Sequence, residues 1–383
     1  MKNMGERIVN IRMFGGTMVP VAATYYHQTS VLKKYHGRRG FYPGLLLIGI
    51  ANHYSPCLES LISLFSTAAS SFSEAVQLIH EALGFKVDVK TIRTIVKRFA
   101  ERARSAVELD KFEQPDDFSD RIVAASTDGG RIRIRKNKRG KKTKKGRTRY
   151  STDWREPKLL IIYVVGSEGR QERSMLPIMD ATMNGPDETF ALLLFYLKKL
   201  NVEASDLLVF VSDGAKWIWE RAKNIAGQLG IAASRCLLVL DYYHAVEHLS
   251  VLASLKRWTA KEKEKWVRKQ KKRLLEGKLE KFMIDVGLAC KGTKNSKLRR
   301  EHNYFKNHLP HMDYVNLKSQ GLPIGSGAVE SGIRRVLNLR LKGPGIFWHE
   351  DSADAMLMLR SYYKAGRWNM LKNMAYSQDL LVA

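Results

Sequence analysis

Residues 207–220 read LLVFVSDGAKWIWE, and the rest of the chain is organised around this stretch. Residues 207–211 form a short, wholly apolar run, which is typical of a β-strand buried on both faces. The run ends at Ser212 and Asp213, and apolar residues at helical spacing follow. Asp213 is therefore expected at the carboxyl end of a buried strand, where α/β sheets carry their reactive groups. The alternative is that Asp213 only caps the helix that follows it.

The composition predicts a large globular protein with a polyanionic partner. The chain has 383 residues, with 65 Lys and Arg against 38 Asp and Glu, and a formal net charge of +27. A chain of this length accommodates two or three domains, and so large a basic surplus favours nucleic acid as the partner. A membrane surface is the rival, but no terminal stretch has the basic, strongly amphipathic pattern that it would require.

The sequence also predicts a soluble, cytoplasmic protein. Glu6 and Arg7 stand where the apolar core of a signal peptide would begin, and the longest apolar run, residues 44–51, is too short to span a bilayer. The 3 cysteines lie far apart without a CxxC pair, which argues against a disulfide framework or a zinc knuckle. With DNA as the partner, we expect the protein at the nucleoid.

The first part of the chain predicts a small β-rich, basic segment over residues 1–44, with a hairpin around Gly15 and Gly16, and a helical domain over residues 45–106. Residues 107–120 are acidic and contain Pro115, which is typical of a linker.

Two helices of the predicted helical domain resemble a helix-turn-helix. We expect one over residues 73–83 with Ser73 as its N-cap, a break at Gly84, and a second helix from residue 89 capped by Asp88. The second helix carries basic residues that we expect to face outward and to contact DNA, namely Lys90, Arg93, Lys97 and Arg98. The alternative is an ordinary helical hairpin that does not touch DNA.

A second carboxylate ends another strand-like run. Residues 121–126 are β-like and lead to Asp128, and residues 131–149 then hold 12 Lys or Arg and no acidic residue. So dense a cluster of like charge cannot be buried, so it is either a solvated loop or a phosphate-binding one, and the acidic site beside it favours the second. The basic residues predicted to contact DNA here are Arg131, Arg133, Arg135, Lys141, Lys142, Lys144, Lys145 and Arg147.

The order of the elements from residue 121 predicts an α/β fold with a ribonuclease-H-like core. Strand patterns at residues 158–165, 171–180, 207–211 and 235–240 follow the first strand, with helices at 186–200 and after each of the last two strands. Residues 121–249 are expected to form the first part of this core. Residues 250–320 are charged and without a strand pattern, so we expect an all-helical insertion, and residues 321–383 should complete the core with two helices.

Phosphodiester cleavage with two divalent ions requires carboxylates that converge from separate elements. Asp128 and Asp213 supply two of them from strand ends, and we expect Glu330, which follows a Gly-rich turn, to supply the third from a helix. Glu247, Glu301 and Glu350 are rivals for that third position. Basic residues after Glu330 would hold a DNA phosphate at the site, and these are Arg334, Arg335, Arg340 and Lys342.

Four segments, STDGG, VFVSDGAKWIW, LDYYHAVEHL and GSGAVESGIRRVLNLRLKGPGIFW, resemble those of bacterial insertion-sequence transposases with a DDE site, allied to the Mutator-like group. The resemblance implies that Asp128, Asp213 and Glu330 are catalytic and hold two Mg²⁺ or Mn²⁺ ions. It implies double-stranded DNA as the substrate, both element terminal repeats and target, and a homo-oligomer on that DNA. Asp241 and His244 match an Asp-x-x-His motif of the group and would be accessory, or else a helix cap and a packed histidine.

One segment departs from that family pattern. Relatives carry a cysteine-containing, zinc-ribbon-like segment before an RGFYP-type stretch, but this chain has only His27 and His36 there. Zinc binding is therefore not expected. Two alternatives to a transposase remain, namely a catalytically silent DNA-binding protein derived from one, and a structure-specific nuclease on the same fold.

Overall fold

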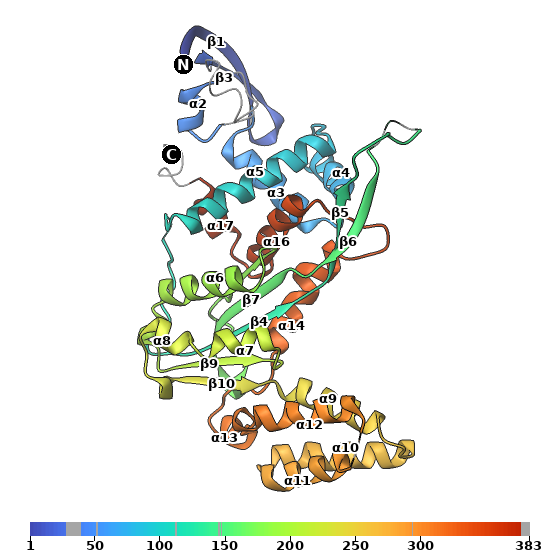
Figure 1. The fold of residues 1–383 in the computed structure, drawn as a ribbon. Helices are drawn as coiled ribbons and strands as arrows, with labels where there is room; N and C mark the ends of the chain where they lie inside the picture. The colour runs from blue at the N-terminus through green and yellow to red at the C-terminus, as the bar shows by residue number, and fades with distance from the viewer. Residues whose placement is uncertain are drawn as a thin grey trace. The chain divides into compact units, whose positions relative to one another are not determined.

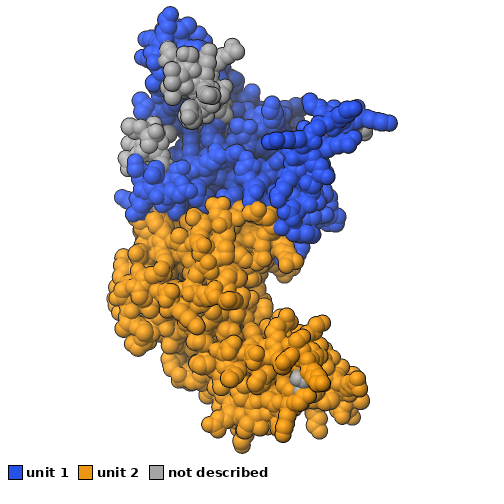
Figure 2. All heavy atoms as spheres, in the orientation of Figure 1, with its two compact units in different colours: residues 1–113, 132–154, 338–383 blue, residues 114–131, 155–337 orange. Residues whose placement is uncertain are grey.

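The computed structural model describes residues 1–27, 40–50, 53–111, 113–144, 146, 148–292 and 294–376. The chain divides into two compact units, which Figure 2 distinguishes by colour. Unit 1 comprises residues 1–113, 132–154 and 338–383, and unit 2 comprises residues 114–131 and 155–337.

Unit 2 is built on a five-stranded mixed sheet with the strand order β10-β9-β4-β7-β8 (Figure 1). The strands are β4 (Ile122–Gly129), β7 (Lys158–Val164), β8 (Ile178–Thr182), β9 (Leu207–Ser212) and β10 (Cys236–Leu240). β9 pairs in parallel with β4 and β10, whereas β7 pairs antiparallel with β4 and β8. The predicted α/β class is confirmed. The predicted strand at 171–180 starts later, at Ile178, directly after Pro177, which has no backbone N–H for the ladder.

The helices of unit 2 flank this sheet and fill the predicted insertion. They are α6 (Pro186–Lys199), α7 (Lys216–Ala222), α8 (Ile225–Leu229), α9 (Tyr242–Ser254), α10 (Ala260–Leu275), α11 (Leu279–Cys290), α12 (Ser296–His308), α13 (Tyr314–Ser319) and α14 (Gly327–Ile333). Buried Val209 of β9 and Val239 of β10 share one apolar cluster with Phe282 of α11 and Phe305 of α12. The helical insertion is therefore packed on the β10 side of the sheet through a common core.

Unit 1 combines two small β structures with a helical core. Its strands are β1 (Lys2–Arg12), β2 (Met18–His27), β3 (Gly40–Phe41), β5 (Ile132–Asn137) and β6 (Tyr150–Arg155), and its helices are α2 (Pro43–Leu47), α3 (Pro56–Ala68), α4 (Phe72–Leu83), α5 (Val89–Glu108), α15 (Leu339–Leu341), α16 (Glu350–Lys364) and α17 (Trp368–Ala375). β1 and β2 form the predicted antiparallel hairpin around Gly15 and Gly16. Asp88 caps α5 as predicted, but the N-cap of α4 is Ser71 rather than Ser73.

Two segments assigned to the catalytic core from the sequence belong to unit 1. The basic segment forms a two-stranded ribbon of β5 and β6, with the lysine-rich residues between the strands. The tail after residue 338 packs through α16 on α3 and α5 and through α17 on α5. The residues of α16 are buried on almost every side of the helix. Its sequence therefore lacks a single apolar face that would indicate which element it packs on.

A buried carboxylate joins α3 to α5 in unit 1. Glu59 is fully buried, forms an ion pair with Arg98, and lies 3.7 Å from Nη1 of Arg102. Tyr376 donates its hydroxyl to Oε2 of Glu59 over 3.0 Å. The side chain of Arg98 is only 14% exposed, so the prediction that it faces outward was wrong. Its position on α5 flanks the apolar face, and the buried partner on α3 draws it inward.

Across the residues that the structure describes, no helix is both long and apolar enough to cross a bilayer.

Candidate metal and phosphoryl-transfer site

The carboxyl ends of three neighbouring parallel strands of unit 2 each carry an aspartate. β4 and β9 pair from Ile122 opposite Leu207 to Ala125 opposite Phe210, and this register, continued along both strands, sets Asp128 level with Asp213. The pairing of β9 with β10 ends at Ser212 opposite Leu240, so the next residues, Asp213 and Asp241, also stand level. Parallel pairing thus arranges Asp128, Asp213 and Asp241 as a row at one end of the sheet.

Asp128 lies in an environment that disfavours its charge. Burial raises its pKa to about 6, and the nearby charge of Asp213 adds to the rise. A hydrogen bond of 2.6 Å from the backbone N–H of Gly129 to Oδ1 works in the opposite direction, as do the charges of His244 and Lys158. A carboxyl group destabilised by burial and by a second carboxylate is one that a bound cation would stabilise in its ionised form.

Asp213 occupies the tight connection between β9 and α7. Its Oδ1 accepts a hydrogen bond of 2.8 Å from the backbone N–H of Ala215, and Ala215 itself is the N-cap of α7, without a side-chain cap. Asp213 is therefore not the N-cap of α7, and the alternative in which it only caps this helix is wrong. Tyr304 of α12 donates its hydroxyl to the carbonyl oxygen of Asp213 over 3.0 Å, so the insertion helps to hold this residue.

Gly214 gives the connection its shape. Its φ of +88° lies in the left-handed region, and an added Cβ would lie 3.0 Å from Leu240 Cδ1, 3.0 Å from Tyr304 Cε2 and 3.1 Å from His308 Nε2. Glycine alone fits this position without strain.

Replacing Gly214 with alanine should therefore destabilise unit 2 and displace Asp213. The positive φ and the three close contacts should together cost about 1–3 kcal/mol, measured as an earlier thermal transition by tryptophan fluorescence. Gly227→Ala is the matched control, because Gly227 lies in α8 with nothing within 4 Å of an added Cβ. It should be neutral or slightly stabilising. Equal melting curves for the two variants would contradict this account of Gly214.

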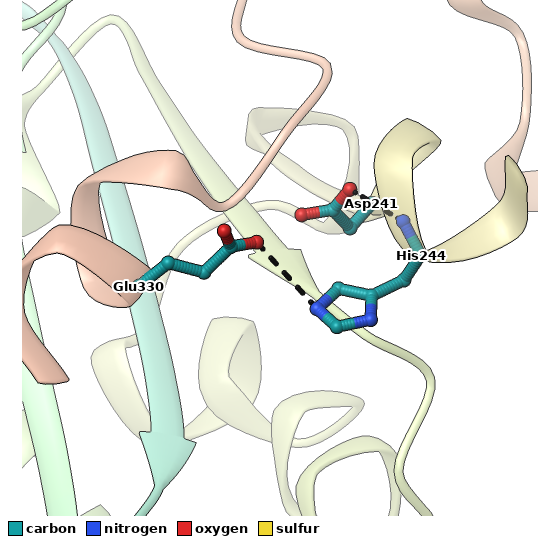
Figure 3. Close-up of side chains that lie close together, drawn as sticks. All are labelled: Asp241, His244 and Glu330. Carbon is teal, nitrogen blue, oxygen red and sulfur yellow. Dashed lines mark hydrogen bonds and ion pairs between the residues drawn. The ribbon is translucent and has the colours of Figure 1, made fainter. Parts of the chain in front are cut away.

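Asp241, the third aspartate of this row, also belongs to a second group of side chains. Asp241, His244 and Glu330 each offer a ligand atom, and these atoms all lie within 4.8 Å of one another (Figure 3). Nε2 of His244 lies 3.5 Å from Oε1 of Glu330. Asp241 and His244 come from the start of α9, and Glu330 comes from α14, a helix that packs on β4 and β7. Unit 2 thus brings Glu330 to the end of the sheet where the aspartates stand.

Asp241 acts as a helix cap that also ties two elements together. Its Oδ1 accepts hydrogen bonds from the backbone N–H groups of Tyr243 and His244, over 2.5 and 3.1 Å. Its Oδ2 accepts from the backbone N–H of Ser326, over 2.6 Å, and from the hydroxyl of the same serine. That hydroxyl also lies 3.3 Å from Oε1 of Glu330. The buried Asp241 therefore fixes the start of α14, and with it the base of Glu330.

The surroundings of the four glutamates separate Glu330 from its rivals. Glu301 is buried in an ion pair with His248, with a distance of 2.5 Å between Oε2 and Nδ1. Glu350 is the first residue of α16 and does not belong to the group of ligand atoms formed by Asp241, His244 and Glu330 among the described residues. Glu247 lies 3.4 Å from Nδ1 of His244 with its side chain 73% exposed. Glu330 is 48% exposed and pairs with His244, rather than with Arg334 one helical turn along, among the ion pairs of the described residues.

The predicted site residues are brought together in part. Among the described residues, the one group with ligand atoms within 4.8 Å of each other contains Glu330, Asp241 and His244, and it includes neither Asp128 nor Asp213. Asp128 and Asp213 form the other half of the site. The charges of Asp213 and of His244 both act on the pKa of Asp128.

Sequence reasoning missed two residues of this site, Ser326 and Lys158. Ser326 joins Asp241 to Glu330, and the signal for it is its place between two glycines before an acidic helix. Lys158 opens the apolar strand β7, is 6% exposed, and lies 2.5 Å from Oε1 of Glu156. A lysine as the first residue of a strand that is otherwise apolar is the signal that could have identified it.

The residues predicted to contact DNA have varied surroundings. Lys90 and Arg93 are exposed on α5, Lys97 pairs with Asp351, and Arg98 is turned inward. The exposed ones elsewhere are Arg131, Lys141, Lys142, Lys144, Arg334 and Lys342, whereas Arg133, Arg135 and Arg335 are half-buried. Lys145 and Arg147 lie outside the described residues, as does His36. Arg340 is buried, with 4% exposure, and belongs to unit 1, so the DNA contact predicted for it at the carboxylates of unit 2 stays a prediction.

Comparisons with known proteins give little beyond this geometry. No family model and no curated protein matches the chain. Among solved structures, the chain is similar to one described as the Drosophila P element transposase strand transfer complex, with 8% sequence identity and a TM-score of 0.29. That similarity covers 90% of this chain and 84% of the other.

Proposed function

We propose that the chain is a metal-dependent DNA transposase of the DDE type, allied to the Mutator-like group of insertion-sequence transposases. The observation that carries the proposal is the row of carboxylates at one end of the sheet. Asp128 and Asp213 stand level on paired parallel strands, and Glu330 reaches the same end from a helix packed on β4. Phosphoryl transfer with two divalent ions needs such carboxylates from separate elements.

We infer a ribonuclease-H-like core from the order of the elements in unit 2. Two antiparallel strands, β7 and β8, follow β4, and the parallel strands β9 and β10 then alternate with α6, α7 and α9. This is the order expected for such a core from the sequence pattern, with carboxylates at the ends of the first and fourth strands. The helical insertion then separates Glu330 from the two aspartates along the chain.

Asp128, Asp213 and Glu330 are the residues proposed to hold two Mg²⁺ or Mn²⁺ ions. Their hard oxygen donors suit these ions, and the hydrogen bonds described for the two aspartates occupy Oδ1 of each. When bound, the ions would stabilise charge on phosphoryl oxygens and lower the pKa of an attacking water. The raised pKa of Asp128 supports this assignment, since a cation there would relieve its repulsion from Asp213.

The neighbouring residues would position these ligands and the DNA. His244 holds the carboxylate of Glu330, and Asp241 with Ser326 fixes the helix that carries it. A groove of about 800 Å³ adjoins the site, lined by Tyr243 and Gly325, by the cations Lys318 and Arg335, and by Arg170, which pairs with Glu168 of the same lining over 3.2 Å. Cations along such a groove would contact the phosphates of a DNA strand.

The test is cleavage and joining of labelled DNA that contains the ends of the element flanking this gene. With Mg²⁺ or Mn²⁺, the protein should hydrolyse a phosphodiester at the element end, leaving a 3′-hydroxyl, and then join that hydroxyl to target DNA. Binding without cleavage under any metal condition would favour a silent DNA-binding protein. Cleavage of branched DNA without joining would instead favour a structure-specific nuclease. In the proposed role the protein acts on DNA at the nucleoid as a homo-oligomer.

A further inference from the structure

A cavity of about 270 Å³ in unit 1 is lined by cations and aromatic rings and by no acidic residue. Its cations are Arg93 of α5, Arg135 of β5 and Arg340 of α15, and the first turn of α4 contributes Ser71 and Ser73. The volume is below the range of about 300–1,000 Å³ that holds drug-sized ligands, so a phosphate-sized group suits it better.

Arg340 is the decisive residue of this cavity. It is 4% exposed, and its Nε and Nη2 atoms have no hydrogen-bond partner among the residues that the structure describes. Buried N–H donors without partners are costly, so Nε and Nη2 call for an acceptor that is absent from the described residues. Burial, together with the charge of Arg360, lowers the pKa of Arg340 to about 10, which still leaves it charged at neutral pH.

The aromatic contacts of Arg340 leave its donors available. Its guanidinium lies 5.1 Å from the ring centroid of Phe72 and 5.1 Å from that of Trp348. Cation–π contacts engage the face of a guanidinium, whereas its N–H groups point outward in the plane. The planar fork of N–H groups that remains matches the geometry of a phosphate.

The surrounding charges favour an anion at the same place. Arg93 lies over the ring of Phe72 with a distance of 5.4 Å, and Arg135 donates toward His349, also in the lining. Glu74 is the carboxylate whose charge reaches Arg340, and it lies outside the lining. Its Oε2 accepts hydrogen bonds from the backbone N–H and the hydroxyl of Ser70. The start of α4, a helix of 12 residues, adds its own partial positive charge.

We propose that this cavity of unit 1 is a phosphate-binding site centred on Arg340, and that its occupant is a backbone phosphate of DNA. The phosphate site follows from the cavity, its cations and the two unpartnered nitrogens of Arg340, whereas DNA as the source of the phosphate rests on the proposed function. Its lining includes none of the proposed metal ligands, so its role would be to bind DNA and not to take part in the chemistry.

The test compares Arg340→Met with Arg360→Met in the full-length protein. Arg360 is also buried in unit 1, but its Nη1 donates to the carbonyl oxygen of Thr67 over 2.8 Å. Without ligand, Arg340→Met should melt at the same temperature as the wild type or higher, and Arg360→Met should melt lower. Inorganic phosphate, compared with chloride at equal ionic strength, should raise the melting temperature of the wild type and of Arg360→Met more than that of Arg340→Met.

Duplex DNA forms the second arm of the test and needs no cleavage activity. Arg340→Met should weaken DNA binding by about tenfold or more and reduce the slope of log K against log salt by about 0.9. Arg360→Met removes a charge that reaches Arg340 but no proposed phosphate ligand, so it should change the affinity and the slope much less than Arg340→Met does. A phosphate effect without a DNA effect would overturn DNA as the source. If Arg340→Met keeps both the stabilisation by phosphate and the DNA affinity of the wild type, the cavity is not a phosphate site. The same conclusion follows if Arg340→Met melts well below the wild type without ligand. A protein that binds phosphate here but cleaves no DNA would refute only the transposase proposal.

Discussion

An Asp213→Asn protein should lose DNA cleavage and joining by about 10³-fold or more while keeping its fold. The substitution removes one anionic ligand from the proposed metal site but preserves the size and the hydrogen bond to Ala215, since an amide oxygen also accepts. Loss of several kcal/mol of transition-state stabilisation corresponds to at least about a thousandfold in rate. The measurement is the initial rate of strand cleavage on labelled element ends with saturating Mg²⁺.

Asp206→Asn is the matched control for that substitution. Asp206 immediately precedes β9, the strand that Asp213 follows, and its side chain is exposed at the opposite end from the proposed site. The substitution removes the same charge next to the same strand. It should leave the cleavage rate within about twofold, since exposed substitutions rarely change stability by more than about 0.5 kcal/mol. Equal rates for Asp213→Asn and the wild type would sink the assignment of Asp213 as a ligand.

A Glu59→Ala substitution should strongly reduce the free energy of unfolding of unit 1. Glu59 is fully buried and pairs with Arg98 and Arg102, so its removal leaves two guanidinium groups near each other without their carboxylate. Removing one partner of a buried ion pair costs about 3–5 kcal/mol. Hydrogen exchange of α3 and α5 measures this directly, because each 1.4 kcal/mol makes opening roughly tenfold more frequent.

The control for Glu59 is Glu81→Ala, which removes an exposed carboxylate from α4. It should leave the exchange of α5 unchanged, because an exposed substitution of this kind falls within about 0.5 kcal/mol. Exchange rates in α3 and α5 that stay at the wild-type value in Glu59→Ala would show that the buried pair does not hold these helices together.

The strands of unit 2 could be predicted because their sequence patterns are local. The apolar run before Asp213 is too short for a helix and ends abruptly, so both the strand and the position of Asp213 at its end follow from neighbouring residues. The same holds for β4 and Asp128. That the two aspartates stand level depends on the register between β4 and β9, which no local pattern encodes.

Residues whose partners lie far along the chain could not be placed in this way. Arg98 was predicted to face outward because it is one of several basic residues on the same helix. In the structure it pairs in the interior with Glu59 of another helix. Arg340 follows Glu330 closely in sequence, yet it belongs to a different unit, where aromatic rings cover it. Ser326 gains its importance only because β10 brings Asp241 within hydrogen-bond distance.

Binding of Mn²⁺, followed by the electron paramagnetic resonance signal of the free ion, tests the proposed metal site most directly. The wild-type protein should remove Mn²⁺ from solution, and Asp128→Asn, Asp213→Asn and Glu330→Gln should each weaken that binding by about tenfold or more, since each removes a charged ligand. Asp206→Asn should bind as the wild type does. Wild-type affinity in all three ligand variants would contradict the claim that these carboxylates form one metal site.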